Sequence, residues 1–156
     1  MFLSVHTCAG AVIGRFSPNP IVAFLLGFLS HFLLDIIPHG DMKIYDVYRS
    51  GKILRRMVAI IALDGIFSIY VAVLVLIGDN RFGNEMNIAA GIFGSVLPDL
   101  FVMFYEVTKI KILKKFHEFH FKLHRFIAGK REVPYVFGIV YQLVALFFLL
   151  VYVQIF

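Results

Sequence analysis

The stretch MVAIIALDGIFSIYVAVLVLIG, residues Met57–Gly78, decides the fold class, because Asp64 is its only charged residue. A helix rises ~1.5 Å per residue, so about 20 mostly apolar residues cross the hydrocarbon core of a membrane. A second stretch, PYVFGIVYQLVALFFLLVYVQIF at Pro134–Phe156, carries no charge and opens with a proline that suits a first helical turn. Both stretches therefore predict membrane-spanning helices.

Three more apolar segments precede or separate these two. Pro20–Ile37 and Asn87–Tyr105 are long enough to be candidate spans, whereas Phe2–Gly14 is short and predicts a retained helix packed inside the bundle. Of the 156 residues, 60% are hydrophobic, well above the roughly 45–50% of soluble domains. We expect an all-α fold in which residues 1–156 form a single membrane-embedded domain, an integral membrane bundle of four or five hydrophobic helices.

An additional, amphipathic helix is predicted at Thr108–Ile127, where apolar residues recur at helical spacing among Lys and Arg residues. If the five hydrophobic segments alternate in direction, every Lys and Arg except Arg15 and Arg81 falls on one side, in the 38–57 and 106–133 loops. The positive-inside rule makes that side, and the amphipathic helix, cytoplasmic. We therefore predict a multi-pass protein of the cell inner (plasma) membrane with an external C-terminus. The net charge of +5 then indicates contact with membrane lipids, and no nucleic acid partner is expected.

Ionisable residues inside hydrophobic segments are the first place to look for function, because each costs roughly 2.5–3.5 kcal/mol on insertion scales. Histidine or aspartate occurs in four of these segments and in a turn just after the second: His6, His31, Asp35, Asp64, Asp99, His39 and Asp41. Helices that alternate in direction bring these side chains to a similar depth, near the predicted cytoplasmic ends. The shared depth predicts one polar site that opens to the cytoplasm.

The spacing of these residues suits metal binding. His31 and Asp35 are four apart, so a helix points both side chains in the same direction. His117, His120 and His124 share one face of the amphipathic helix in the same way. Imidazole and carboxylate together suit a divalent metal, above all Zn²⁺, or Mn²⁺ and Fe where oxygen ligands dominate. The predicted metal ligands are His6, His31, Asp35, Asp99, His120 and His124.

Structural roles stay open for these residues at this point. His31 with Asp35 can be a hydrogen-bonded pair that ties helices together, and Asp64 or Asp99 can cap a neighbouring helix or accept hydrogen bonds at a kink. The histidines of the amphipathic helix can be interfacial residues beside lipid phosphates. The Pro-His-Gly-Asp sequence that contains His39 fits a turn as well as it fits metal ligation.

Four short motifs occur in order along the chain. They are Ser-Val-His-Thr in the first segment, GFLSHFLLDIIPHGD at Gly27–Asp41, Leu-Pro-Asp at Leu97–Asp99 and the histidine-rich stretch that begins at His117. As an ordered set they resemble the bacterial membrane-bound metal-dependent hydrolases of the LexA-regulated, inner-membrane type. The His-x-x-x-Asp sequence with a histidine shortly after it is also similar, locally, to the metal-binding helix of zinc-dependent phospholipase C.

The resemblance implies a metal-dependent hydrolase with His6, His31, Asp35 and Asp99 among its metal ligands. The chain departs from the family pattern after His124-Arg125, where the usual Thr-His-Ser is missing. The leading hypothesis is hydrolysis of a phosphoester or lipid-linked substrate at the cytoplasmic face, with Asp64 or Glu118 as general base. The alternative hypothesis is a non-enzymatic membrane protein, either an ion or proton carrier or an assembly scaffold, in which the polar cluster is structural.

Overall fold

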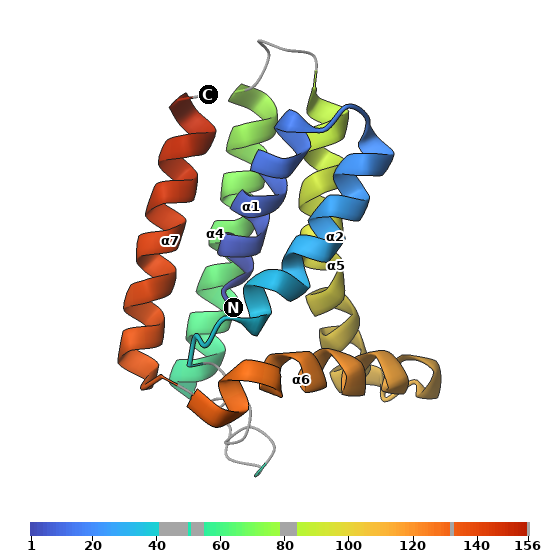
Figure 1. The fold of residues 1–156 in the computed structure, drawn as a ribbon, viewed down its shortest axis with the longest axis vertical. Coiled ribbons are helices and arrows are strands. Elements are labelled where there is room, and N and C mark those ends of the chain that lie inside the picture. Colours follow the sequence, from blue (N-terminus) through green and yellow to red (C-terminus); the bar gives the residue numbers. More distant parts are fainter. Residues whose placement is uncertain (41–49, 51–54, 79–83, 132, 156) are drawn as a thin grey trace.

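The computed structural model describes residues 1–40, 50, 55–78, 84–131 and 133–155. Regular structure within these residues is entirely helical, as the sequence predicted. Its helices are α1 (Leu3–Phe16), α2 (Pro20–Ile36), α4 (Arg55–Gly78), α5 (Glu85–Thr108), α6 (Lys111–Arg131) and α7 (Tyr135–Ile155). Figure 1 shows that five of them form one bundle and that α6 runs across its lower end.

Local signals explain several of the helix boundaries. α2 begins after Asn19, whose side chain accepts a hydrogen bond from the Val22 N–H at 2.9 Å, and Pro20 occupies its first turn. α5 ends where Lys109 adopts a left-handed conformation with φ 55°, a common way to end a helix. The change of direction at Lys109 allows α6 to turn away from the bundle axis (Figure 1).

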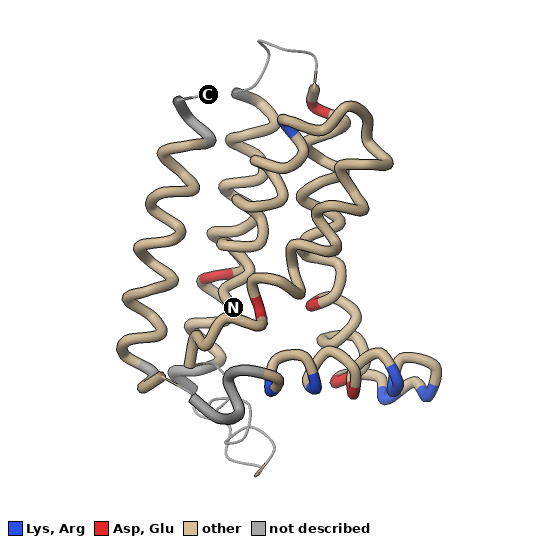
Figure 2. The backbone as a smooth tube through the Cα atoms, viewed as in Figure 1, with Lys and Arg blue, Asp and Glu red and all other residues tan. Residues whose placement is uncertain are grey.

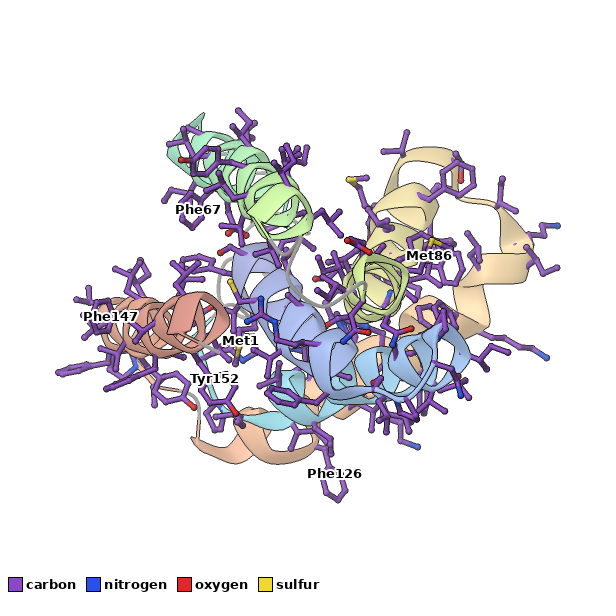
Figure 3. The ribbon with its side chains drawn as sticks, turned by 90° about the horizontal axis from the view of Figure 1, so that it is seen from above. Met1, Phe67, Met86, Phe126, Phe147 and Tyr152 are labelled. Atoms are coloured by element: carbon purple, nitrogen blue, oxygen red, sulfur yellow. The ribbon has the colours of Figure 1, made fainter. Side chains whose placement is uncertain are left out.

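The centre of the bundle is occupied by α1, which lies between α7, α4, α5 and α2 when the molecule is viewed from above (Figure 3). Its glycines bring two backbones together, because a Cβ on Gly10 would lie 2.5 Å from Gly91 O and one on Gly14 would lie 2.5 Å from Asn87 O. A Cβ on Gly91 would in turn lie 2.3 Å from Gly10 O. Residues without a side chain are needed for so close an approach. The contact fixes α1 against α5.

The outer surface of the bundle is apolar, with large aliphatic and aromatic side chains of α2, α4, α5 and α7 exposed. In α4, Val58–Ile77 has a mean hydropathy of 2.6, yet only 11% of its most apolar 18-residue stretch is buried. α5 has a mean hydropathy of 1.7, and 28% of the corresponding 18-residue stretch is buried. Core helices of soluble proteins are mostly buried, so this surface is compatible with a lipid environment.

By length and composition, α4 and α5 are the two helices of the described residues that can cross a membrane. α2 and the Val136–Tyr152 part of α7 are apolar but shorter. Among the described residues, positive charge gathers along α6 (Figure 2). The last turn of α1, which contains Arg15, lies at the opposite end of the bundle (Figure 1). Most of the predicted basic 38–57 loop lies outside the described residues, as do Asp41 and Arg81.

Candidate metal centre

Buried histidine and aspartate side chains meet where α2 ends, above α6. We call this group the His/Asp cluster; it consists of His31, Asp35, His39, Asp99, His120 and His124. α2 provides His31 and Asp35 one turn apart, and α6 provides its two histidines one turn apart. α5 provides Asp99, and the chain just after α2 provides His39. All of these side chains are buried except that of Asp99, which is 30% exposed.

Four members of the cluster form one potential coordination group: His31, Asp35, Asp99 and His120. His31 Nε2 lies 2.9 Å from Asp35 Oδ2 and 3.7 Å from Asp99 Oδ1. His120 Nε2 lies 3.6 Å from Asp35 Oδ2 and 3.7 Å from the same Asp99 oxygen. Ligand atoms bound to a tetrahedral zinc ion at 2.0–2.2 Å lie about 3.3–3.6 Å apart. The spacing in this group is therefore close to that of a single coordination sphere.

Asp35 also belongs to a second potential coordination group, with His39 and His124. His124 Nε2 lies 2.8 Å from Asp35 Oδ2, the oxygen that also faces the first group. His39 Nδ1 lies 2.6 Å from the Ile37 carbonyl oxygen, and the His39 ring centroid lies 5.2 Å from that of His124. The two groups are thus joined through one carboxylate oxygen.

The hydrogen bonds of His31 indicate what surrounds Asp35. His31 Nδ1 lies 2.8 Å from the Ser95 carbonyl oxygen, which can only accept, so Nδ1 carries the hydrogen. Nε2 then presents to Asp35 Oδ2 either the lone pair of a neutral ring or the N–H of a protonated one. Oδ2 is buried and accepts no hydrogen bond of regular geometry within the described residues. A lone pair directed at a carboxylate repels it unless a proton or a metal cation lies between the two atoms. In addition, metal-binding histidines commonly donate their other N–H to a carbonyl, as His31 does to Ser95.

The other oxygen of Asp35 is engaged from α1. The Met1 nitrogen donates to Asp35 Oδ1 at 2.9 Å, and His6 Nε2 lies 3.1 Å from the same oxygen. The His6 ring also stacks on His31 with 4.2 Å between ring centroids. His6 therefore supports two cluster residues but belongs to neither coordination group. That His6 is a direct metal ligand stays a prediction.

Burial sets the charge state of His120. The loss of hydration lowers the pKa of His120 to about 3, against the opposing attraction of Asp99. An imidazole with so low a pKa is neutral at physiological pH. The neutral ring is the form that binds a metal ion, so His120 is ready to act as a ligand without first losing a proton.

Asp64 lies apart from the His/Asp cluster, at the start of α1. Its Oδ2 accepts a hydrogen bond from the Leu3 N–H at 2.6 Å, and its Oδ1 accepts from the Ser4 N–H at 3.2 Å and from the Ser4 hydroxyl. The first N–H groups of a helix need acceptors from outside the helix, and Asp64 of α4 provides them for α1. Both of its oxygens are used in this way. These contacts are those of a helix cap outside the cluster, and the general-base role of Asp64 stays a prediction.

Glu118 and His117 also lie outside the cluster. Glu118 lies on the outer face of α6, where its side chain is 62% exposed and its Oε1 lies 3.8 Å from Lys114 Nζ. His117 Nε2 lies 2.7 Å from Glu106 Oε1 and so links α6 to α5. Residues two apart on a helix point in nearly opposite directions. Because His120 points into the cluster, Glu118 points away from it. The prediction that Glu118 is a general base does not agree with this placement.

Two supporting groups were not predicted from the sequence. The Ser95 carbonyl orients His31, and the Gln142 side-chain amide of α7 donates to the His39 carbonyl at 3.2 Å. Gln142 carried a usable signal, since it is a polar residue within an otherwise apolar segment. A backbone carbonyl such as that of Ser95 leaves no mark in a sequence.

Compared with known protein families, curated proteins and solved structures, the chain has no match in any of the three. The resemblance carried by its short motifs therefore stays a prediction. Inference about its function begins from the geometry of the His/Asp cluster and from the surface around it.

Proposed function

We propose that this chain is a multi-pass protein of the inner (plasma) membrane and a metal-dependent hydrolase that acts on a phosphoester or lipid-linked substrate at the cytoplasmic face. The observation that carries the proposal is the first coordination group, whose four ligand atoms all lie within 4.8 Å of one another. α2 contributes to this group together with α5 and α6, which follow much later in the chain. Its nitrogen and oxygen donors favour zinc, and Mn²⁺ or Fe accepts the same set.

The membrane part of the proposal is supported by the surface of the bundle. α2, α4, α5 and α7 are the hydrophobic spans, and α1 is a shorter fifth helix held at their centre by its glycines. The apolar side chains exposed on the spans then face lipid and cost nothing in hydration. The basic α6 end is the cytoplasmic end under the positive-inside rule.

The chemistry follows from the donors that the cluster brings together. When bound, a divalent ion polarises a phosphoryl oxygen and lowers the pKa of a nearby water molecule. His31, Asp35, Asp99 and His120 hold the ion, and His6 orients Asp35 through its hydrogen bond. Asp99 is the one ligand of this group with an exposed side chain, so the substrate approaches the cluster from its side.

α6 supports a substrate at the membrane surface. Ile112, Phe119 and Phe126 are seven residues apart and 82%, 50% and 71% exposed, so they form an apolar edge along the helix. Lys115 and Lys122 lie beside this edge and are also exposed. An apolar edge beside basic side chains is typical of a helix that lies among anionic lipid head groups. α6 then brings lipid phosphates close to the cluster that its own histidines complete.

Phosphoester hydrolysis by the purified, zinc-loaded protein tests the proposal, with release of p-nitrophenol or, for phosphatidic acid, of phosphate as the readout. We expect hydrolysis of at least one of three probes: p-nitrophenyl phosphate, bis(p-nitrophenyl) phosphate, or phosphatidic acid in vesicles. Asp99→Asn should lower the rate by at least about 100-fold, because loss of one carboxylate weakens or displaces the ion. His117→Ala is the matched control, since it removes a histidine from the same region of α6 without touching the cluster.

The alternative is a non-enzymatic membrane protein whose cluster has a structural role. Zinc-loaded wild-type protein that hydrolyses none of the three probes would favour this alternative. Equal losses of activity in Asp99→Asn and His117→Ala would likewise contradict the proposed site, because only one of the two residues belongs to it.

A further inference from the structure

We propose that the His/Asp cluster holds two divalent cations, bridged by Oδ2 of Asp35. The inference rests on the proposed metal-dependent function and adds a second site to it. The first ion takes the four-residue group already described, and the second is bound by Asp35, His39 and His124. Within each group all ligand atoms lie within 4.8 Å of one another, and Asp35 is the residue that the two groups share.

The contacts of Asp35 point to a bridge through a single oxygen. Its Oδ1 is engaged by the Met1 nitrogen and by His6, which leaves Oδ2 as the metal-binding atom. Oδ2 faces one imidazole of each group, with His31 Nε2 at 2.9 Å and His124 Nε2 at 2.8 Å. No hydrogen bond of regular geometry reaches this buried oxygen within the described part of the chain. A cation beside each of these ring nitrogens would account for two imidazoles so close to one carboxylate oxygen.

The two sites differ in the number of protein ligands. The first has four protein ligands and the second has three. Three protein ligands with one open position is the arrangement of catalytic zinc sites, and paired ions ~3.5–4 Å apart act together in many phosphoester hydrolases. Two dications against two carboxylates also leave the cluster positively charged. We therefore infer that the second ion adds an open position to the proposed site, where it binds the same anionic phosphoester together with the first ion.

α7 provides independent support for the second site, because it holds His39 in place. The fully buried Gln142 donates to the His39 carbonyl at 3.2 Å, and it also accepts a hydrogen bond from the Phe2 N–H. Gly138 lies against the same carbonyl, since a Cβ there would be 2.1 Å from it. A buried glutamine in an apolar helix is costly, and here it positions a ligand. Gln142 is therefore a positioning residue for the second ion.

Counting zinc in the full chain, purified in detergent and freed of loosely bound metal, tests the inference. We expect two zinc ions per chain in the wild type and one in His39→Ala or His124→Ala. The remaining ion shows that these variants are folded. Gln142→Leu should weaken binding of the second ion about 10-fold or more and leave the first unchanged. His117→Ala, the matched histidine control, should keep both ions.

Reloading with Mn²⁺ tests the bridge itself. Two Mn²⁺ ions that share Asp35 Oδ2 give a spin-coupled electron paramagnetic resonance spectrum, and His39→Ala should convert it to that of an isolated ion. A wild type with one zinc, lost in His31→Ala and retained in His39→Ala, would overturn the second site and leave the proposed function standing. A wild type with no zinc would overturn both, and two uncoupled Mn²⁺ ions would overturn the bridge.

Discussion

Asp35 and Asp64 are both aspartates within apolar helices, but their surroundings differ. Asp64 receives hydrogen bonds from the N–H groups of Leu3 and Ser4 and from the Ser4 hydroxyl, so each of its oxygens meets a donor. Of the two Asp35 oxygens, Oδ1 meets a donor in the same way, because the Met1 nitrogen donates to it. Its other oxygen, Oδ2, lies beside the Nε2 atoms of His31 and His124 and accepts no hydrogen bond of regular geometry among the described residues.

The difference separates a structural carboxylate from a candidate ligand. A buried carboxylate surrounded by donors is stabilised by those donors alone. One that faces lone pairs is stable only when a proton or a cation lies between them. The chemical nature of each partner atom therefore separates the two aspartates, of which Asp35 is buried and Asp64 is half-buried.

Metal removal should have the largest effect on stability, and it should act through Asp35. A ligand present at about 1,000 times its Kd stabilises the folded state by ~4 kcal/mol, which corresponds to roughly 10 °C in Tm for a chain of this size. We expect a chelator to lower the Tm of the zinc-loaded wild type by that amount. The Asp64→Asn protein should show the same shift, whereas the Tm of Asp35→Asn should not respond to the chelator. A wild type with an unchanged Tm would contradict the account.

Loss of the helix cap should have a smaller effect, independent of metal. Asp64→Ala removes the acceptors for the Leu3 and Ser4 N–H groups, and losing a cap costs about 1–2 kcal/mol. We expect a Tm lower by a few degrees and an unchanged zinc content. Ser4→Ala, which removes one of the three donors, is the graded control and should cost less. Loss of zinc in Asp64→Ala alongside a folded circular dichroism spectrum would place Asp64 back in the site.

The smallest effect is expected at Glu118, which is exposed on the outer face of α6. Glu118→Gln should change the free energy of unfolding by less than about 0.5 kcal/mol, because an exposed ion pair contributes little. Zinc content and the rate of phosphate release should also match the wild type. A large fall in the rate with unchanged zinc would show that Glu118 is a general base after all, brought to the cluster by a movement of α6.

Apolar patterning predicted the helices closely. Each of the five hydrophobic segments and the amphipathic segment corresponds to one helix, because burial and lipid contact act on long runs of residues. Boundaries were less accurate where a single residue decides them. The predicted segment that ended at Tyr105 continues as α5 to Thr108, until Lys109 takes its left-handed conformation.

Within the candidate site, helical spacing predicted the pairs on one helix, and shared depth predicted that Asp99 and the α6 histidines lie near them. His31 lies against Asp35 and His120 against His124, since four-residue spacing determines their common direction. The same reasoning did not separate Asp64, which sits in an apolar segment at a depth similar to that of Asp35. The Ser4 group that it caps is 60 residues away in the chain, and no local pattern connects them.

The most direct test of the central claim is the metal content of three purified proteins: wild type, Asp35→Asn and Asp64→Asn. Both substitutions keep side-chain size and remove one charge from an apolar helix, so they differ only in which aspartate is changed. We predict bound zinc in the wild type and in Asp64→Asn, and no zinc in Asp35→Asn. A wild type without metal, or an Asp35→Asn protein that retains it in full, would contradict the claim that Asp35 is at the centre of a metal site.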